Sequence, residues 1–157
     1  MIEIEIPGYE NIKIKNIVFD FNGTIAEDGV LIKGVEGKIK ELSLKDINIF
    51  VLTADTYGTV VKQCEELPVE VKVFNKENAS VDKKNIVESL GRDLTVSVGN
   101  GRNDMEMFKS SLISIAIVGK EGCYGKAMME ADIVVTSIID AIDLLLNCNR
   151  IKATLRT

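Results

Sequence analysis

Histidine is absent from this chain of 157 residues. Without an imidazole, the chain cannot use a histidine base, a histidine nucleophile or a histidine metal ligand. Any catalysis must therefore use carboxylates, lysine, threonine, amides and metal ions that are bound through oxygen atoms.

The cysteines are few and widely spaced. Cys64, Cys123 and Cys148 form neither a metal-binding motif nor a disulfide framework, so we expect free thiols, as in the reducing cytoplasm. No apolar run approaches the roughly 18 residues that span a bilayer. The alternating start, residues 1–6, is typical of a strand rather than a signal peptide or anchor. The sequence therefore predicts a cytoplasmic protein without membrane association.

Basic residues are outnumbered. Lys and Arg total 19 against 24 Asp and Glu, which gives a net charge of −5, and no basic run is present. This balance argues against sequence-independent binding to nucleic acid. The hydrophobic content of 46% and the length are sufficient for the core of one domain.

Apolar runs alternate with segments of helical periodicity. Strands are expected at about 2–6, 11–20, 47–52, 69–74, 94–98, 112–118 and 133–135, and helices at about 34–43, 57–66, 80–91, after 104, at 125–130 and at 138–147. Strands and helices that alternate in this way form right-handed βαβ units. We therefore expect one α/β domain, a three-layer Rossmann-like fold with a mainly parallel sheet over residues 16–157.

Two hairpins are expected outside this alternation. An N-terminal β-hairpin of residues 2–16 would turn at Pro7-Gly8, and a short one within residues 25–32 would turn at Glu27-Asp28-Gly29. The last predicted helix, 138–147, is apolar nearly all round. Such a helix is either deeply buried or covered by a partner, and burial is the favoured interpretation.

Three predicted strands end in polar residues. Asp20 ends the first buried strand before an Asn-Gly turn, Thr53 ends the second, and Asn100 follows a third. In open α/β sheets, ligands bind at the carboxyl ends of the strands. A carboxylate there can act as a nucleophile toward phosphorus, and Lys83, near the start of its helix, can supply a fixed cation. Asn100 and Asp104 offer oxygen ligands of the kind that Mg²⁺ prefers.

Each of these residues also has a purely structural interpretation. Asp20 can simply begin a turn, Thr53 can end a strand, and Lys83 can be one more solvated lysine. Asn103 and Asp104 are common helix N-cap residues. Their order and their placement at strand ends together favour a phosphoryl site.

The same residues resemble the four motifs of the haloacid dehalogenase (HAD) superfamily. Asp20-Phe21-Asn22-Gly23-Thr24 resembles the first motif, Asp-x-Asp-x-Thr. The segments 52–55 and 99–104 resemble the Thr-Gly-Asp and Gly-Asp-Gly-x-Asn-Asp motifs of P-type ATPases. With segment 131–136 and the chain end, the resemblance covers about residues 15–157. It is closest to the capless, soluble P-type ATPase-like HAD proteins.

The resemblance implies a role for each matched residue. Catalytic roles fall to Asp20, Asn22, Thr24, Thr53 and Lys83. Phosphate binding falls to Gly23, Thr53, Ala54 and Lys83. A Mg²⁺ ion would be bound by Asp20, the backbone oxygen of Asn22, Asn100 and Asp104. Supporting positions are Gly99, Gly101 and Asn103.

Two asparagines depart from the motifs of the superfamily. Asn22 replaces the Asp that acts as general acid and base, and Asn100 replaces a metal-binding carboxylate. An amide carries no proton between states, so hydrolysis through an aspartyl phosphate on Asp20 should be slow unless Glu27, Asp28 or Asp55 moves the protons. Mg²⁺ binding should be weakened but not abolished. The alternative is a stoichiometric phosphate-binding or phospho-acceptor module with a regulatory role.

No segment is long enough to form the cap domain that gives many HAD proteins their specificity. Capless members either act on large substrates or borrow a neighbouring subunit as a lid, so a homo-oligomer is one of two alternatives. The expected ligand is phosphate or a small phosphorylated substrate.

Overall fold

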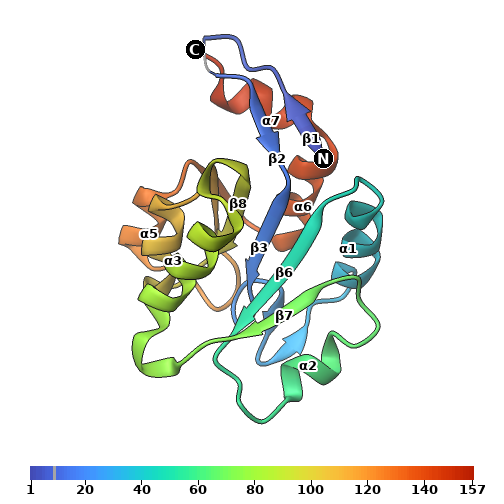
Figure 1. The fold of residues 1–157 in the computed structure, drawn as a ribbon, viewed down its shortest axis with the longest axis vertical. Helices are drawn as coiled ribbons and strands as arrows, with labels where there is room; N and C mark the ends of the chain where they lie inside the picture. Colours follow the sequence, from blue (N-terminus) through green and yellow to red (C-terminus); the bar gives the residue numbers. More distant parts are fainter. Residues whose placement is uncertain (9) are drawn as a thin grey trace.

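The computed structural model describes residues 1–8 and 10–157 (Figure 1), so Tyr9 of the expected N-terminal hairpin lies outside the described residues. At its centre is a six-stranded sheet in which each pair of neighbouring strands runs parallel. The strand order is β10 (Ile133–Val135), β9 (Ile113–Ile117), β8 (Thr95–Gly99), β3 (Asn16–Asp20), β6 (Asn48–Thr53) and β7 (Glu70–Val73). The predicted α/β fold with a mainly parallel sheet is confirmed.

Strand β3 lies inside the sheet, between β6 and β8. Its side chains alternate between two apolar clusters, with Ile17 and Phe19 on one face and Val18 on the other. Because β3 is buried on both faces, its sequence is a nearly continuous apolar run. The register with β6 extends to the pair Asp20 and Leu52, which brings the end of β3 level with the end of β6.

Helices cover both faces of the sheet. On the Val18 face, helices α3 (Ala79–Leu90), α4 (Met105–Lys109) and α5 (Gly125–Glu130) contribute buried side chains to the core. On the other face, α1 (Val35–Ser43), α2 (Thr59–Gln63) and α6 (Ile138–Leu146) do so. The result is the expected three-layer arrangement (Figure 1).

The N-terminal hairpin lies beyond one end of the sheet (Figure 1). Strand β1 (Ile2–Ile4) pairs antiparallel with β2 (Ile12–Ile14). The expected single strand at 11–20 is thus two strands, because the chain leaves the hairpin at Lys15 and enters the sheet at Asn16. The side chain of Asn16 is buried, donates to the Leu90 oxygen at 2.8 Å and accepts from Asn48 Nδ2 at 2.9 Å.

Helix α7 (Cys148–Leu155) was not expected from the sequence. In this helix Ile151 is fully buried and the other side chains are exposed or half-buried, so few apolar residues mark the helix in the sequence. Helix α6 is buried within the chain, as the favoured interpretation held: Ala141, Ile142 and Leu145 are fully buried. Lys38 of α1 also binds Asp143 of α6, with the ammonium 2.6 Å from Oδ1. No helix in the described residues is long and apolar enough to cross a bilayer.

The second hairpin lies beside the end of β3. Strands β4 (Ala26–Glu27) and β5 (Val30–Leu31) are joined by Asp28 and Gly29, with φ of 50° and 77°. Positive φ at both turn residues is the geometry that an Asp-Gly turn favours. Between β6 and α3 the chain forms only α2, β7 and the 3-10 turn η1 (Lys76–Asn78). The segments where a cap domain would be inserted are therefore short.

Candidate active site

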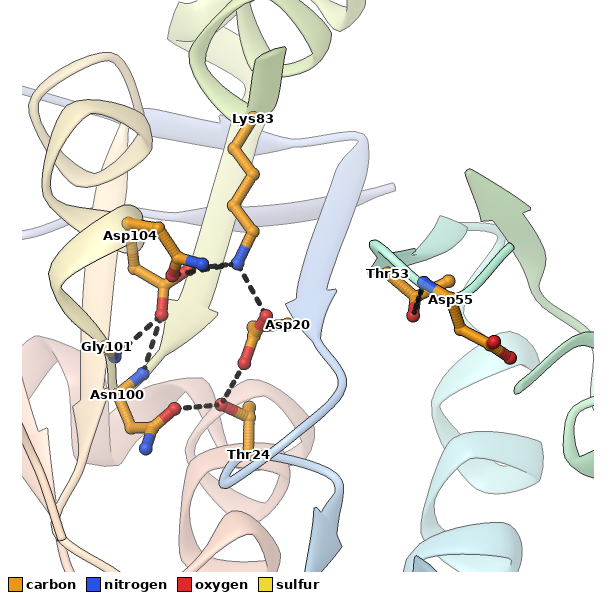
Figure 2. Close-up of polar contacts among 9 residues, drawn as sticks. Asp20, Thr24, Thr53, Asp55, Lys83, Asn100, Gly101 and Asp104 are labelled. Carbon is orange, nitrogen blue, oxygen red and sulfur yellow. Dashed lines mark hydrogen bonds and ion pairs between the residues drawn. The ribbon is translucent and has the colours of Figure 1, made fainter. Parts of the chain in front are cut away.

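A buried lysine joins two carboxylates at the carboxyl edge of the sheet (Figure 2). Lys83 of α3 is fully buried, and its ammonium donates to Asp20 Oδ1 at 2.5 Å and to Asp104 Oδ1 at 2.7 Å. A third hydrogen bond, of 3.2 Å, goes to Asn103 Oδ1. A buried ammonium is tolerated only when it is paired and hydrogen-bonded. Lys83 is therefore not a solvated helix lysine, and its three N–H donors are all used.

The charges in this cluster affect one another. Burial, and then the neighbouring Asp104 carboxylate, raise the pKa of Asp20 to about 7, although Lys83 and Thr24 favour its ionised form. Burial lowers the pKa of Lys83, but Asp20 and Asp104 more than offset this effect, so its pKa is raised. Lys83 therefore stays cationic, and Asp20 titrates near neutral pH.

Asp104 also fixes the loop that follows β8. Its Oδ2 accepts from the backbone N–H groups of Asn100, at 3.0 Å, and Gly101, at 2.8 Å. A Cβ atom on Gly99 would lie 2.5 Å from the Asp104 carboxyl group, so this close approach requires glycine. Asp104 thus connects Lys83 to the turn that holds Asn100.

Thr24 and Asn100 face the other oxygen of Asp20. The Thr24 hydroxyl lies 3.3 Å from both Asp20 Oδ2 and Asn100 Oδ1, and its single hydrogen can serve one of them at a time. Asn100 Nδ2 donates to the Gly122 oxygen at 3.0 Å, while the amide oxygen of Asn100 faces the Thr24 hydroxyl. Gly23 has φ of 75°, and a Cβ atom there would collide with the Asn100 amide.

Thr53 lies at the same edge but belongs to a separate group of contacts (Figure 2). Its buried hydroxyl accepts from the Asp55 N–H at 3.0 Å. The Asp55 carboxylate accepts from the N–H groups of Val60 and Tyr57, both at 2.9 Å, and these bonds lower the pKa of Asp55. In the described residues, no hydrogen bond joins Thr53 to Asp20 or Lys83.

A cavity of about 860 Å³ opens over these groups. Seven residues expected at the site line it: Asp20, Asn22, Thr53, Ala54, Asn100, Gly101 and Asn103. The other five expected residues lie behind this lining: Gly23, Thr24, Lys83, Gly99 and Asp104. The structure thus brings the residues of all four motifs to one edge of the sheet.

Sequence reasoning did not assign ten of the lining residues to the site, among them Phe74, Lys76 and Arg102. Phe74 follows β7, which ends at the same edge as β3 and β6. The rule that ligands bind at strand ends could have found Phe74. Arg102 lies within segment 99–104, which follows β8, so the same rule could have found it. Lys76 lies in the turn η1 and carries no such signal.

The oxygen atoms near Asp20 are of the kind that Mg²⁺ uses. Asp20 Oδ2 and Asn100 Oδ1 approach the same hydroxyl, and two carboxylates stand against one ammonium, so the local charge is negative. In residues 1–8 and 10–157, no group of three acidic or cysteine side chains is arranged to hold a metal ion. A Mg²⁺ ion here would depend on one carboxylate, neutral oxygens and water, which suits an ion that retains several waters.

Comparison with known sequences identifies relatives in one organism. No family model matches the chain. An uncharacterised protein of Methanocaldococcus jannaschii is 41% identical over 80 residues, which cover 48% of this chain and 86% of the relative. A soluble P-type ATPase-like phosphatase of the same organism is 25% identical over 123 residues, which are 77% of this chain and 45% of that protein. The chain therefore spans less than half of the relative that is called a phosphatase.

Solved structures share the fold. A cobalt-bound deoxy-D-mannose-octulosonate 8-phosphate phosphatase of Haemophilus influenzae has a TM-score of 0.73 at 15% identity, over 92% of this chain and 94% of the other. A 3-deoxy-D-manno-octulosonate 8-phosphate phosphatase of Moraxella catarrhalis, in complex with magnesium, phosphate and KDO, has a TM-score of 0.71 at 14% identity. The match covers 91% of this chain and 94% of the other. A phosphoserine phosphatase has a TM-score of 0.64 at 21% identity, over 85% of this chain and 98% of the other. A protein of Streptomyces avermitilis that is assigned to the HAD family of hydrolases has a TM-score of 0.68 at 20% identity, over 85% of this chain and 84% of the other. The expected resemblance is therefore confirmed at the level of the fold, which is that of the haloacid dehalogenase superfamily.

Proposed function

We propose that the chain is a slow, Mg²⁺-dependent phosphohydrolase that acts on phosphate esters through an aspartyl phosphate on Asp20. One observation carries this proposal. The carboxylate of Asp20 lies at the end of the central strand with one oxygen on Lys83 and the other beside Thr24, at the floor of the cavity. The phosphatases that share the fold, and the phosphatase relative, support the same reaction class.

In the first step, a carboxylate oxygen of Asp20 forms a bond to phosphorus and the phosphorus–oxygen bond of the ester breaks. Lys83, a buried cation directly behind Asp20, offsets part of the negative charge that the phosphoryl group brings to the site. The Thr53 hydroxyl accepts from the Asp55 N–H, which leaves its own hydrogen free to donate to a phosphoryl oxygen. The leaving oxygen takes its proton from water, because the Asn22 amide has none to give.

In the second step, water attacks phosphorus, the bond to Asp20 breaks, and phosphate leaves. The water must lose a proton, and none of the three acids named as substitutes for an acid at position 22, Glu27, Asp28 and Asp55, lines the cavity. Glu27 is paired with Lys120 at 3.0 Å, and Asp55 is held by two backbone N–H groups. The phosphoenzyme should therefore break down slowly, by a factor on the order of 10²–10⁴ relative to a site with a proton carrier.

Mg²⁺ would be held by Asp20, the backbone oxygen of Asn22 and the amide oxygen of Asn100. Both oxygens of Asp104 already accept hydrogen bonds from the protein, so Asp104 would act on the ion through water. When bound, the ion neutralises charge on the phosphoryl oxygens. Because Asn100 is neutral, we propose that the affinity for Mg²⁺ is lower than in a site with a carboxylate there.

The test is phosphate release from para-nitrophenyl phosphate, small phosphate esters and ATP, with Mg²⁺ or with EDTA. The substitution Asp20→Asn should abolish release, whereas Asp93→Asn, at the opposite edge of the sheet, should not. Release that persists in Asp20→Asn would contradict the proposal.

The exposed amide of Asn22 favours a second function if no turnover is found. In that case the chain would be a stoichiometric phospho-acceptor. Mass spectrometry after treatment with acetyl phosphate should then show one phosphoryl group on the intact protein and none on Asp20→Asn.

A further inference from the structure

Phe74 lies between the two groups of polar residues that the reaction requires. It follows β7, it is 7% exposed, and it lines the cavity beside Thr53. The ammonium of Lys83 lies over its ring, 5.2 Å from the ring centre. This distance is within the range of a cation–π interaction, which is strongest where water is excluded.

The backbone around Phe74 is held at both sides. The Phe74 N–H donates to the Thr53 oxygen at 2.9 Å, which continues the pairing of β7 with β6. The next N–H, of Asn75, donates at 3.1 Å to Asp82, the neighbour of Lys83 on α3. The ring is therefore fixed relative to both the end of β6 and the start of α3.

We infer that Phe74 is a positioning residue that holds the Lys83 ammonium in place while Asp20 changes its charge. The catalytic part of this inference rests on the proposed phosphohydrolase function. Phosphorylation would convert the Asp20 carboxylate, one of the three acceptors of Lys83, into a neutral acyl group and move the negative charge onto the phosphoryl oxygens, which weakens the hydrogen bond from Lys83. The face of the Phe74 ring attracts the ammonium in either state, so it limits the movement of a long, flexible side chain when that hydrogen bond weakens.

A role in core packing alone is the competing explanation, and the chain offers a matched control for it. Phe50 is 6% exposed and belongs to the same apolar cluster as Phe74. Its ring also lies 5.2 Å from an ammonium, that of Lys72, but Phe50 does not line the cavity. Phe50→Leu and Phe74→Leu remove the same ring from the same cluster, so a packing effect would appear in both variants.

The kinetic experiment compares Phe74→Leu, Phe74→Tyr and Phe50→Leu. We expect Phe74→Leu to lower kcat by about 2- to 30-fold, the range that follows from a lost cation–π interaction, with KM changed much less. Phe74→Tyr keeps the ring face and should restore kcat to within about twofold of the original protein. Equal values of kcat for Phe74→Leu and Phe50→Leu would overturn the inference.

A measurement without turnover separates this inference from the proposed function. In protein labelled with ¹³C at the lysine ε carbon, the Lys83 signal, assigned with Lys83→Arg, should carry a ring-current shift. That shift should disappear in Phe74→Leu and return in Phe74→Tyr, whereas Phe50→Leu should move the Lys72 signal instead. If the chain releases no phosphate, the proposed function fails while this experiment still tests the contact. A Lys83 signal that is unchanged in Phe74→Leu would overturn the inference whether or not the chain is active.

Discussion

The carboxylate of Asp20 and the ammonium of Lys83, 63 positions apart in the sequence, lie 2.5 Å from each other at the carboxyl end of the central strand. Asp104 approaches the same ammonium from the loop after β8. This cluster places one cation between two carboxylates in the interior of the protein, and its electrostatic balance leads to the first two predictions.

Lys83→Met should strongly destabilise the fold. The change leaves Asp20 and Asp104 buried with no counter-charge, and breaking a buried pair in this way costs about 3–5 kcal/mol. Lys84→Met, at the next and partly exposed position of α3, should change stability by less than about 0.5 kcal/mol. Urea unfolding of both variants measures the difference, and equal losses would contradict this account of Lys83.

The stability of the metal-free protein should depend on the protonation of Asp20. Its pKa is raised from 3.8 to about 7 in the fold, so between these values the native state binds more protons than the unfolded state. Stability from this group is therefore fully present below pH 4 and is lost as the pH rises toward 7. The free energy of unfolding, measured in EDTA from pH 4 to pH 7, should rise in Asp20→Asn relative to the original protein. If the difference in this free energy between the two proteins does not change with pH, Asp20 does not control the pH dependence of stability.

Asn22→Asp should increase turnover. Asn22 lines the cavity with an exposed side chain, so an acid there can reach the leaving group and the attacking water. The expected gain in kcat is on the order of 10²–10⁴. Asn78→Asp adds the same charge to the same cavity and serves as the control, with little or no gain expected. If both variants are equally slow, the role assigned to position 22 is wrong.

Asn100→Asp should strengthen Mg²⁺ binding but destabilise the metal-free protein. A carboxylate adds a charged ligand, yet it cannot donate to the Gly122 oxygen as the amide does. The lost hydrogen bond and the unsatisfied carbonyl should cost about 1–3 kcal/mol. Calorimetric titration with Mg²⁺, with unfolding in EDTA and in Mg²⁺, tests both parts. Affinity that stays the same or falls would argue against Asn100 as a ligand.

Gly23→Ala should be more harmful than Gly29→Ala. Both glycines have positive φ, 75° and 77°, so alanine at either position should cost about 1–2 kcal/mol. A Cβ atom at Gly23 would also collide with the Asn100 amide, whereas at Gly29 it would meet no described atom within 4 Å. Thermal unfolding should show a larger loss of stability, and phosphate release a larger loss of activity, in Gly23→Ala than in Gly29→Ala. Similar losses in the two variants would show that the contact between Gly23 and Asn100 is not important.

The order of the strands and helices, and the edge of the sheet at which the site lies, could be predicted because the strands are short apolar runs that stop at polar residues. Asp20, Thr53 and Asn100 each follow such a run, and parallel pairing brings the run ends together. Phe74 was missed because an aromatic residue after a strand reads as core, although the same rule applied to it. Helix α7 was missed because it is short and mainly polar, so few apolar residues mark it in the sequence.

The contacts of Asp104 could not be predicted from the sequence. Its neighbours Asn103 and Asn100 suggested a metal site or a helix cap, but nothing local indicates that one carboxylate binds both Lys83 and two backbone N–H groups. These contacts join residues from α3 and from the loop after β8, and they exist only once the two segments are packed together. A role of Asp104 toward Mg²⁺ stays a prediction.

Asp20 is held by an interior strand of the sheet, whereas several residues around the cavity lie on turns. Five consecutive residues of β3, Asp20 included, pair with β6, and the four residues before Asp20 pair with β8, so Asp20 ends a strand that is held on both sides. Asn22, Lys76 and Arg102, by contrast, lie on turns outside the sheet. Such segments tolerate substitution and open more easily than a central strand. Changes in these residues can therefore alter which molecules the cavity accepts while Asp20 stays where it is.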